Sequence, residues 1–207
     1  MHVRPAALPL VVLFLGVAYV RGAQAQVGHD AHAGHTATPP AETSVEARPD
    51  VAFMQGMIPH HAQALEMAAL VDGRDARREV RLMAERIAVS QRDEIRWMRQ
   101  WLTDHGADAP GEHAHHTSHS AMVGMATPAQ MADLAAATGP AFDRLFFELM
   151  VRHHEGALSM AGDLLAAPGG TAEPDVFQFV ADLEADQGAE IDRMQTILSR
   201  FQPSPTP

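Results

Sequence analysis

A helical pattern centred on two adjacent histidines occurs twice in this chain, and the second copy lies 93 residues after the first. The first copy consists of Phe53, Met57, His60, His61, Ala64, Met67 and Ala68, and the second of Phe146, Met150, His153, His154, Ala157, Met160 and Ala161. A second pattern repeats with an offset of 96 residues, first as Gln91, Glu94, Ile95 and Met98 and then as Gln187, Glu190, Ile191 and Met194. Because the two offsets are nearly equal, the chain contains two copies of one helix pair. A unit that occurs only twice indicates a fused pair rather than a solenoid.

Four long amphipathic helices and one short helix are predicted, and no segment of comparable length has the alternation of a strand. Copy one spans residues 50–104, a His-rich crossover linker spans 105–126, and copy two spans 127–202. Asp50 stands where the N-cap of the first helix is expected, and Pro59 should kink that helix just before its histidine pair. Short turns within each copy and one long crossover between them predict an all-α, ferritin-like four-helix bundle made of two repeated helix pairs.

Residues 1–25 have the pattern of a secretory signal peptide. Arg4 precedes an apolar run that is too short to span a bilayer, and Ala23-Gln24-Ala25 provides a small-residue cleavage site. We therefore expect a periplasmic or secreted protein with no stable membrane span after cleavage. Residues 26–49 offer little that could be buried and are predicted to form a disordered, His-rich leader.

The charge and the lack of cysteine restrict the partners of this chain. Its formal net charge of −11 argues against nucleic acid as a partner. An oxidising compartment would permit disulfides, yet the chain contains no cysteine. Stability must therefore come from packing, and any soft metal ligand must be a methionine.

Polar residues interrupt the apolar stripes of all four long helices at matching positions, so they are predicted to point into the core. They are the histidines His60 and His153, the glutamines Gln91 and Gln187, and the glutamates Glu94 and Glu190. Buried carboxylates are costly, and either hydrogen bonds to the histidines or a metal ion would offset that cost. The glutamates could bind the metal or could orient the histidines instead, and the sequence leaves both roles open.

The spacing of methionine and histidine predicts metal sites that bridge helices. Met57 and His61 are four residues apart, as are their equivalents in copy two, so each pair can clamp one ion. His60 and Met67 are separated by about 10.5 Å along a helix, so a shared ion would need ligands from another helix. The predicted ligands are Met57, His60, His61, Met67, Glu94 and Met98 in copy one, and Met150, His153, His154, Met160, Glu190 and Met194 in copy two. Thioether and imidazole without thiolate favour Cu(I), and imidazole also accepts Cu(II) and Zn(II).

Histidines outside the predicted helices form two further tracts. They are His29, His32 and His35 in the leader, and His113, His115, His116 and His119 in the linker. At neutral pH most of these imidazoles are uncharged and able to bind a metal. They could gather metal ions loosely, or they could be incidental residues of polar segments.

Two segments of the chain resemble the family called domain of unknown function 305 (DUF305). The first, from Phe53 to Ala68, reads Phe-Met-Gln-Gly-Met-Ile-Pro-His-His-Ala-Gln-Ala-Leu-Glu-Met-Ala. The second, from Met150 to Ala161, reads Met-Val-Arg-His-His-Glu-Gly-Ala-Leu-Ser-Met-Ala. The resemblance covers roughly residues 50–200. It implies a ferritin-like fold, export, and a link to copper binding and copper tolerance, with the family's His and Met positions at the residues named above.

Three functions compete on this sequence. The first is a copper-binding protein, not an enzyme, that sequesters Cu(I), confers tolerance, or exchanges the ion with a copper donor or acceptor protein. The second is a di-metal carboxylate oxidase, although the Glu-x-x-His spacing typical of that chemistry is absent from the four long helices. The third is a structural or interaction domain whose histidines only pack. The sequence leaves oligomerisation open.

Overall fold

The computed structural model describes residues 48–111 and 122–201, and these residues form five α-helices and no strand. The helices are α1 (Pro49–Ala69), α2 (Arg78–Asp104), α4 (Pro128–Ala136), α5 (Gly139–Ala166) and α6 (Pro174–Arg200). The prediction of an all-α four-helix bundle built from two helix pairs is confirmed. The expected signal peptide and residues 26–47 of the expected leader lie outside the described residues. None of the described helices combines the length and the apolar composition needed to cross a bilayer.

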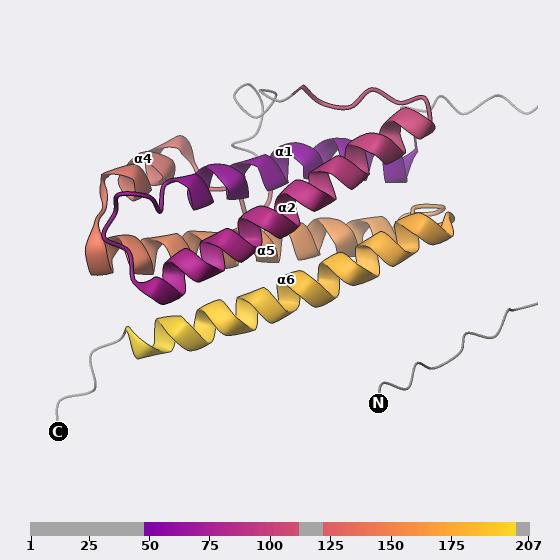
Figure 1. The fold of residues 1–207 in the computed structure, drawn as a ribbon. Helices are drawn as coiled ribbons and strands as arrows, with labels where there is room; N and C mark the ends of the chain where they lie inside the picture. Colours follow the sequence, from indigo (N-terminus) through magenta and orange to yellow (C-terminus); the bar gives the residue numbers. More distant parts are fainter. Residues whose placement is uncertain (1–47, 112–121, 202–207) are drawn as a thin grey trace, which may run out of the picture. The chain divides into compact units, whose positions relative to one another are not determined.

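Three helix contacts organise the bundle. α1 packs against α2, α5 packs against α6, and the two copies meet through α1 and α5 (Figure 1). The helices within each copy run antiparallel, since only a short turn connects them (Figure 1). Because α1 and α5 carry the two histidine pairs, their contact brings the repeated patterns together.

Proline and capping residues set where the helices begin. Proline occupies the first turn of α1, α4, α5 and α6, where a missing backbone N–H costs no helical hydrogen bond. Thr127 and Gln130 form a capping box on α4. The N-cap of α1 is Arg48 and not Asp50, whose carboxylate lies in the first helical turn and pairs with the guanidinium of Arg48. The helix continues through Pro59.

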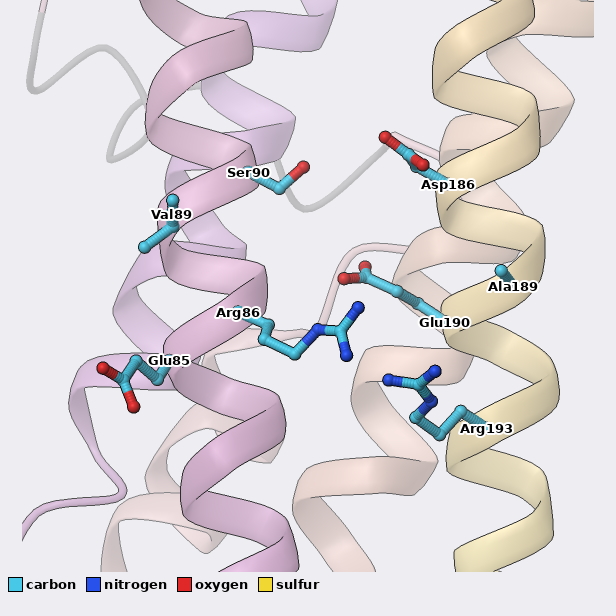
Figure 2. A pocket seen from close by; sticks show the side chains of 8 residues that line it. All are labelled: Glu85, Arg86, Val89, Ser90, Asp186, Ala189, Glu190 and Arg193. Carbon is cyan, nitrogen blue, oxygen red and sulfur yellow. The ribbon is translucent and has the colours of Figure 1, made fainter. Parts of the chain in front are cut away.

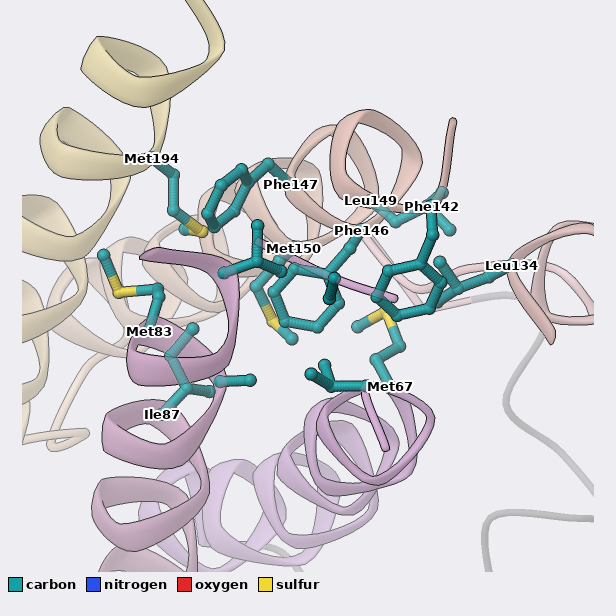
Figure 3. Close-up of a cluster of buried hydrophobic side chains, with 14 of the residues drawn as sticks. Met67, Met83, Ile87, Leu134, Phe142, Phe146, Phe147, Leu149, Met150 and Met194 are labelled. Atoms are coloured by element: carbon teal, nitrogen blue, oxygen red, sulfur yellow. The ribbon is translucent and has the colours of Figure 1, made fainter. Parts of the chain in front are cut away.

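Two hydrophobic clusters fill the core, and on α1 and α5 the histidines lie between them. The one we call the Phe cluster includes Met67, Phe142, Phe146, Phe147, Met150 and Met194 (Figure 3). The one we call the Trp cluster includes Val51, Met57, Met98, Trp101 and Val180. Burying each such large side chain contributes about 1.5–3 kcal/mol, so these clusters are the main source of stability in a chain without disulfides.

The C-terminal end of the crossover is anchored on the bundle. The side-chain amide of Gln63 holds both backbone groups of Ala126, because its Nε2 donates to the carbonyl oxygen at 2.9 Å and its Oε1 accepts from the N–H at 2.7 Å. Gly124 lies against Gly156 of α5, where a Cβ on Gly156 would come within 2.2 Å of the carbonyl oxygen of Val123. The last residues of the predicted linker therefore belong to the bundle.

Gly156 provides a test of the close approach between α5 and the crossover. Gly156→Ala should destabilise the protein by about 1–3 kcal/mol, because the added methyl group would overlap backbone atoms of the crossover. Gly162→Ala, on the same helix, meets no atom within 4 Å. That control should stabilise the protein by about 0.5–1 kcal/mol through helix propensity. Urea denaturation followed by circular dichroism measures both changes, and effects of the same sign would contradict the contact.

Candidate metal centre

Four buried imidazoles form a compact cluster where α1 meets α5. His60 and His61 come from α1, and His153 and His154 come from α5. Adjacent residues of a helix point about 100° apart. In each pair the first histidine, His60 or His153, therefore faces the other copy. The second, His61 or His154, faces the second helix of its own copy. The rings of His60 and His153 lie 3.9 Å apart between centroids, and all four residues are at most 1% exposed.

The two histidines that face the other copy are held by backbone carbonyl groups. Nε2 of His153 donates to the carbonyl oxygen of His60 at 2.7 Å. Nε2 of His60 donates to the carbonyl oxygen of Val123, in the crossover, at 3.1 Å. Because a carbonyl oxygen only accepts, each ring carries its proton on Nε2 and keeps a lone pair on Nδ1.

The two histidines that face their partner helices are held by the repeated glutamates. Nε2 of His61 contacts a carboxylate oxygen of Glu94 at 2.6 Å, and Nε2 of His154 contacts one of Glu190 at 2.8 Å. Ser90 donates a further hydrogen bond to Glu94 at 2.7 Å. The glutamate side chains are mostly buried, with 15% and 14% of their surface exposed. Their contacts are of the kind that fixes the orientation of a metal-binding imidazole from its far side.

The Nδ1 atoms of all four histidines are buried and have no hydrogen-bond partner among the described residues. Leaving a buried polar atom unsatisfied costs about 1–3 kcal/mol, so four such atoms in one cluster require an explanation. Each belongs to a ring that is already held at its other nitrogen, and on His60 and His153 it carries a lone pair. These four atoms are the best-placed metal-binding atoms in the described part of the chain.

Burial keeps the inner imidazoles neutral. Removal from water, followed by repulsion from a charge on His61, lowers the pKa of His60 from 6.5 to about 3. The same causes, burial first and then the charge of His60, lower the pKa of His153 well below 6.5. Burial acts to raise the pKa of Glu94, but the hydrogen bond from His61 and the charge of that ring outweigh it, so this pKa is lowered. The inner rings are thus able to bind a metal ion without first losing a proton.

The contact between His61 and Glu94 also fixes which methionines face each other. α1 and α2 run antiparallel, so Met57, one turn before His61, lies at the level of Met98, one turn after Glu94. Both methionines are fully buried. Copy two repeats this arrangement with His154, Glu190, Met150 and Met194. Each helix pair therefore offers one imidazole and two thioethers on adjacent turns.

The six predicted methionines divide between the two hydrophobic clusters. Met57, Met98 and Met160 lie in or against the Trp cluster, and Met67, Met150 and Met194 lie in the Phe cluster, where Figure 3 shows their thioethers among phenylalanine rings of α5. Each group takes two methionines from one helix pair and a third from the inner helix of the other copy. Met160 is partly buried, and the other five are fully buried.

Residue spacing alone does not identify a role in this centre for two groups, the repeated glutamines and a backbone carbonyl. Gln91 and Gln187 are buried one turn before the glutamates, and neither side-chain amide has a partner among the described residues. Their repetition at inward positions is a usable signal. The carbonyl group of Val123 has no such signal, because every residue type supplies a carbonyl.

No three His, Asp or Glu side chains within residues 48–111 and 122–201 converge on a point where they could hold a metal ion. A centre formed from this part of the chain in this arrangement therefore includes a ligand of another kind, and methionine sulfur is one such ligand. The auxiliary histidines at positions 29, 32, 35, 113, 115, 116 and 119 all lie outside the described residues.

The fold and the site define an all-α bundle whose core buries four histidines and a set of methionines. The chain belongs to the family described as "Domain of unknown function (DUF305)", whose model matches residues 50–198. The resemblance inferred from the doubled His-His pattern is thereby confirmed. No match was found among curated proteins.

Three solved structures are similar to most of this chain. A DUF305 fragment from Deinococcus radiodurans is 37% identical with a TM-score of 0.64, and the match covers 73% of this chain and 96% of that one. A putative secreted DUF305 protein from Streptomyces coelicolor is 27% identical with a TM-score of 0.64, over 74% and 94% of the two chains. CopM in its Cu(I)-bound form is 28% identical with a TM-score of 0.60, over 74% and 98%.

The lowered histidine pKa values predict that acid destabilises the metal-free protein. Below pH 6.5 His60 and His153 bind protons in the unfolded chain but not in the folded protein. The free energy of unfolding therefore decreases as the pH falls from 6.5 toward 3. Between pH 7 and pH 5 the loss should be about 2 kcal/mol for His60, and His153 should add a loss of the same sign. Urea denaturation in the presence of a chelator measures this loss. In His153→Leu the pH dependence should fall by about half, and an unchanged dependence would show that His153 is not a buried neutral ring.

Proposed function

We propose that this protein is an exported copper-binding protein that holds Cu(I) for sequestration, tolerance or delivery, and that it is not an enzyme. The observation that carries the proposal is the set of four buried Nδ1 atoms that have no hydrogen-bond partner in the described part of the chain, on rings already anchored at Nε2. A neutral imidazole held in this way is the usual form of a histidine metal ligand. CopM, which is 28% identical to this chain, has a solved structure in its Cu(I)-bound form, and this supports the choice of metal.

The residues fit a soft, singly charged ion. Thioether sulfur and imidazole nitrogen are uncharged ligands that favour Cu(I), and the chain has no cysteine thiolate to compete with them. We assign one site to each helix pair, with His61, Met57 and Met98 in copy one and His154, Met150 and Met194 in copy two. Met160 and Met67 reach these sites from the other copy. Glu94 and Glu190 fix the rings from the Nε2 side.

The proposal includes exchange of the ion with a partner protein. A periplasmic or secreted protein of this kind would take its ion from a copper donor protein or pass it to an acceptor. Cu(II) or Zn(II) could bind through the imidazoles alone, with weaker dependence on methionine. No observation favours the di-metal oxidase, since the Glu-x-x-His pattern is missing from the four long helices.

Replacing the paired methionines tests the ligand assignment. The double variant Met57→Leu with Met98→Leu should remove one of two tightly bound Cu(I) ions, because leucine keeps the volume but lacks the sulfur. It should cost less than about 1.5 kcal/mol of stability per site. Met54→Leu is the matched control, because Met54 is equally buried on α1 but is replaced by Phe147 in the repeat. Titration against a chromogenic Cu(I) chelator under reducing conditions measures the stoichiometry. Two tightly bound ions in the double variant would mean that these methionines only fill the core.

The glutamates should matter through the rings they orient. Glu94→Gln and Glu190→Gln each keep an acceptor for the histidine Nε2 but weaken the contact that fixes the ring. Changes of this kind typically weaken metal binding by about 10- to 100-fold. Competition titration measures the Cu(I) affinity of the two variants, with Glu184→Gln, an exposed glutamate of α6, as control. Unchanged affinity in both variants would remove the glutamates from the proposal.

A further inference from the structure

A polar groove opens between α2 and α6 on the surface above the metal centre. It has a volume of about 450 Å³ and is lined largely by charged and polar residues of both helices, among them Arg86, Ser90, Asp186, Glu190 and Arg193. Figure 2 shows Ser90 and Arg86 on α2 facing Asp186, Glu190 and Arg193 on α6, with the side chain of Arg86 extending across the groove toward α6.

The groove leads directly to the residues that hold the histidines. Glu190 lines the groove and contacts Nε2 of His154 at 2.8 Å. Ser90 also lines it and donates to Glu94, the equivalent carboxylate of copy one, at 2.7 Å. An ion in the groove is therefore one side chain away from a buried imidazole.

The same seam between α2 and α6 is closed at its other end by two stacked aromatic rings. Trp97 of α2 and Phe179 of α6 lie 4.4 Å apart between centroids, with only 3° between their planes. The repeat offset of 96 residues maps Trp97 onto Arg193 and Met83 onto Phe179. Because α2 and α6 run antiparallel, the register that pairs Trp97 with Phe179 also places Met83 opposite Arg193. A flexible, exposed arginine thus stands where a stacked tryptophan would otherwise close the seam.

We propose that copper enters and leaves the centre through this groove, beside Glu190, and that the Trp97–Phe179 stack closes the equivalent path beside Glu94. This inference rests on the proposed function. Under this proposal the two copies exchange copper with the solvent at different rates, although they carry the same ligand residues. Copy two faces the solvent route, and copy one is filled and emptied by way of the shared histidine cluster.

The side chains of Glu94 and Glu190 are almost equally exposed, at 15% and 14%, and the difference between them lies in their hydrogen bonds. Glu94 is held by two hydrogen bonds, from His61 and from Ser90. Glu190 is held by His154, with no second hydrogen bond from the described residues. Its remaining carboxylate oxygen can meet an incoming cation, and Asp186 adds a second negative charge nearby.

Two substitutions of one residue separate the shape of the groove from its charge. Arg193→Trp introduces the residue type of Trp97, which closes the other end of the seam. Arg193→Ala removes the same charge without filling the space. Both act on an exposed position that is not a proposed ligand, so the fold and the Cu(I) affinity should stay unchanged. We expect Cu(I) transfer to excess chromogenic chelator to be at least about tenfold slower in Arg193→Trp than in Arg193→Ala, equivalent to roughly 1.4 kcal/mol in the barrier.

The reciprocal variant tests the closed end. Trp97→Ala should open the path beside Glu94 and speed up transfer to the chelator, measured by stopped-flow absorbance under reducing conditions. Equal rates in Arg193→Trp and Arg193→Ala, in protein that binds Cu(I) as tightly as the parent, would overturn the groove as the route. A parent protein that binds no Cu(I) would instead overturn the proposed function, and this inference with it.

Discussion

The hydrogen bonds at histidine Nε2 are the interactions on which the rest of this structure depends. They come from four parts of the chain: the glutamates of α2 and α6, the backbone of α1, and the crossover. Each bond fixes the orientation and the tautomer of one ring, and it also fixes the register of one helix or loop relative to its neighbour. The registers of the methionines follow from these contacts, as does the set of inward Nδ1 lone pairs. A bundle held by apolar packing alone would leave these registers less strictly defined.

The two copies use equivalent residues in different ways. Gln63 and Gly156 occupy the same position of the repeat, and both hold the crossover. Gln63 does so with two hydrogen bonds, and Gly156 does so by having no side chain. The crossover then supplies the carbonyl that His60 needs, while His153 uses the backbone of α1. One connection therefore completes the polar contacts of a core that two identical halves would not complete in the same way.

The sequence predicts those features that depend on position within a helix. The inward direction of His60, His153, Glu94 and Glu190 follows from helical spacing, and the repeat doubles the signal. Features that depend on the packing of one helix or loop against another could not be predicted from helical spacing. The division of the methionines between two clusters requires the register of one helix against another. The anchoring of the crossover requires the close approach of Gly124 and Gly156. The N-cap of α1 is Arg48 rather than the expected Asp50, because Pro49 favours the first helical position. Arg48 also pairs with Asp50 and with Glu173, the N-cap residue of α6.

Tandem fusion frees the two halves from the strict symmetry of a homodimer. Two separate chains of one helix pair would carry the same residue at every equivalent position, so an aromatic stack at one end of the α2–α6 seam would be duplicated at the other. In a single chain, Trp97 and Arg193 can be selected independently while the histidines between them stay alike. Gene duplication thus allows a repeated set of histidines and methionines to have a closed end and an open end beside it, without any change in those residues themselves.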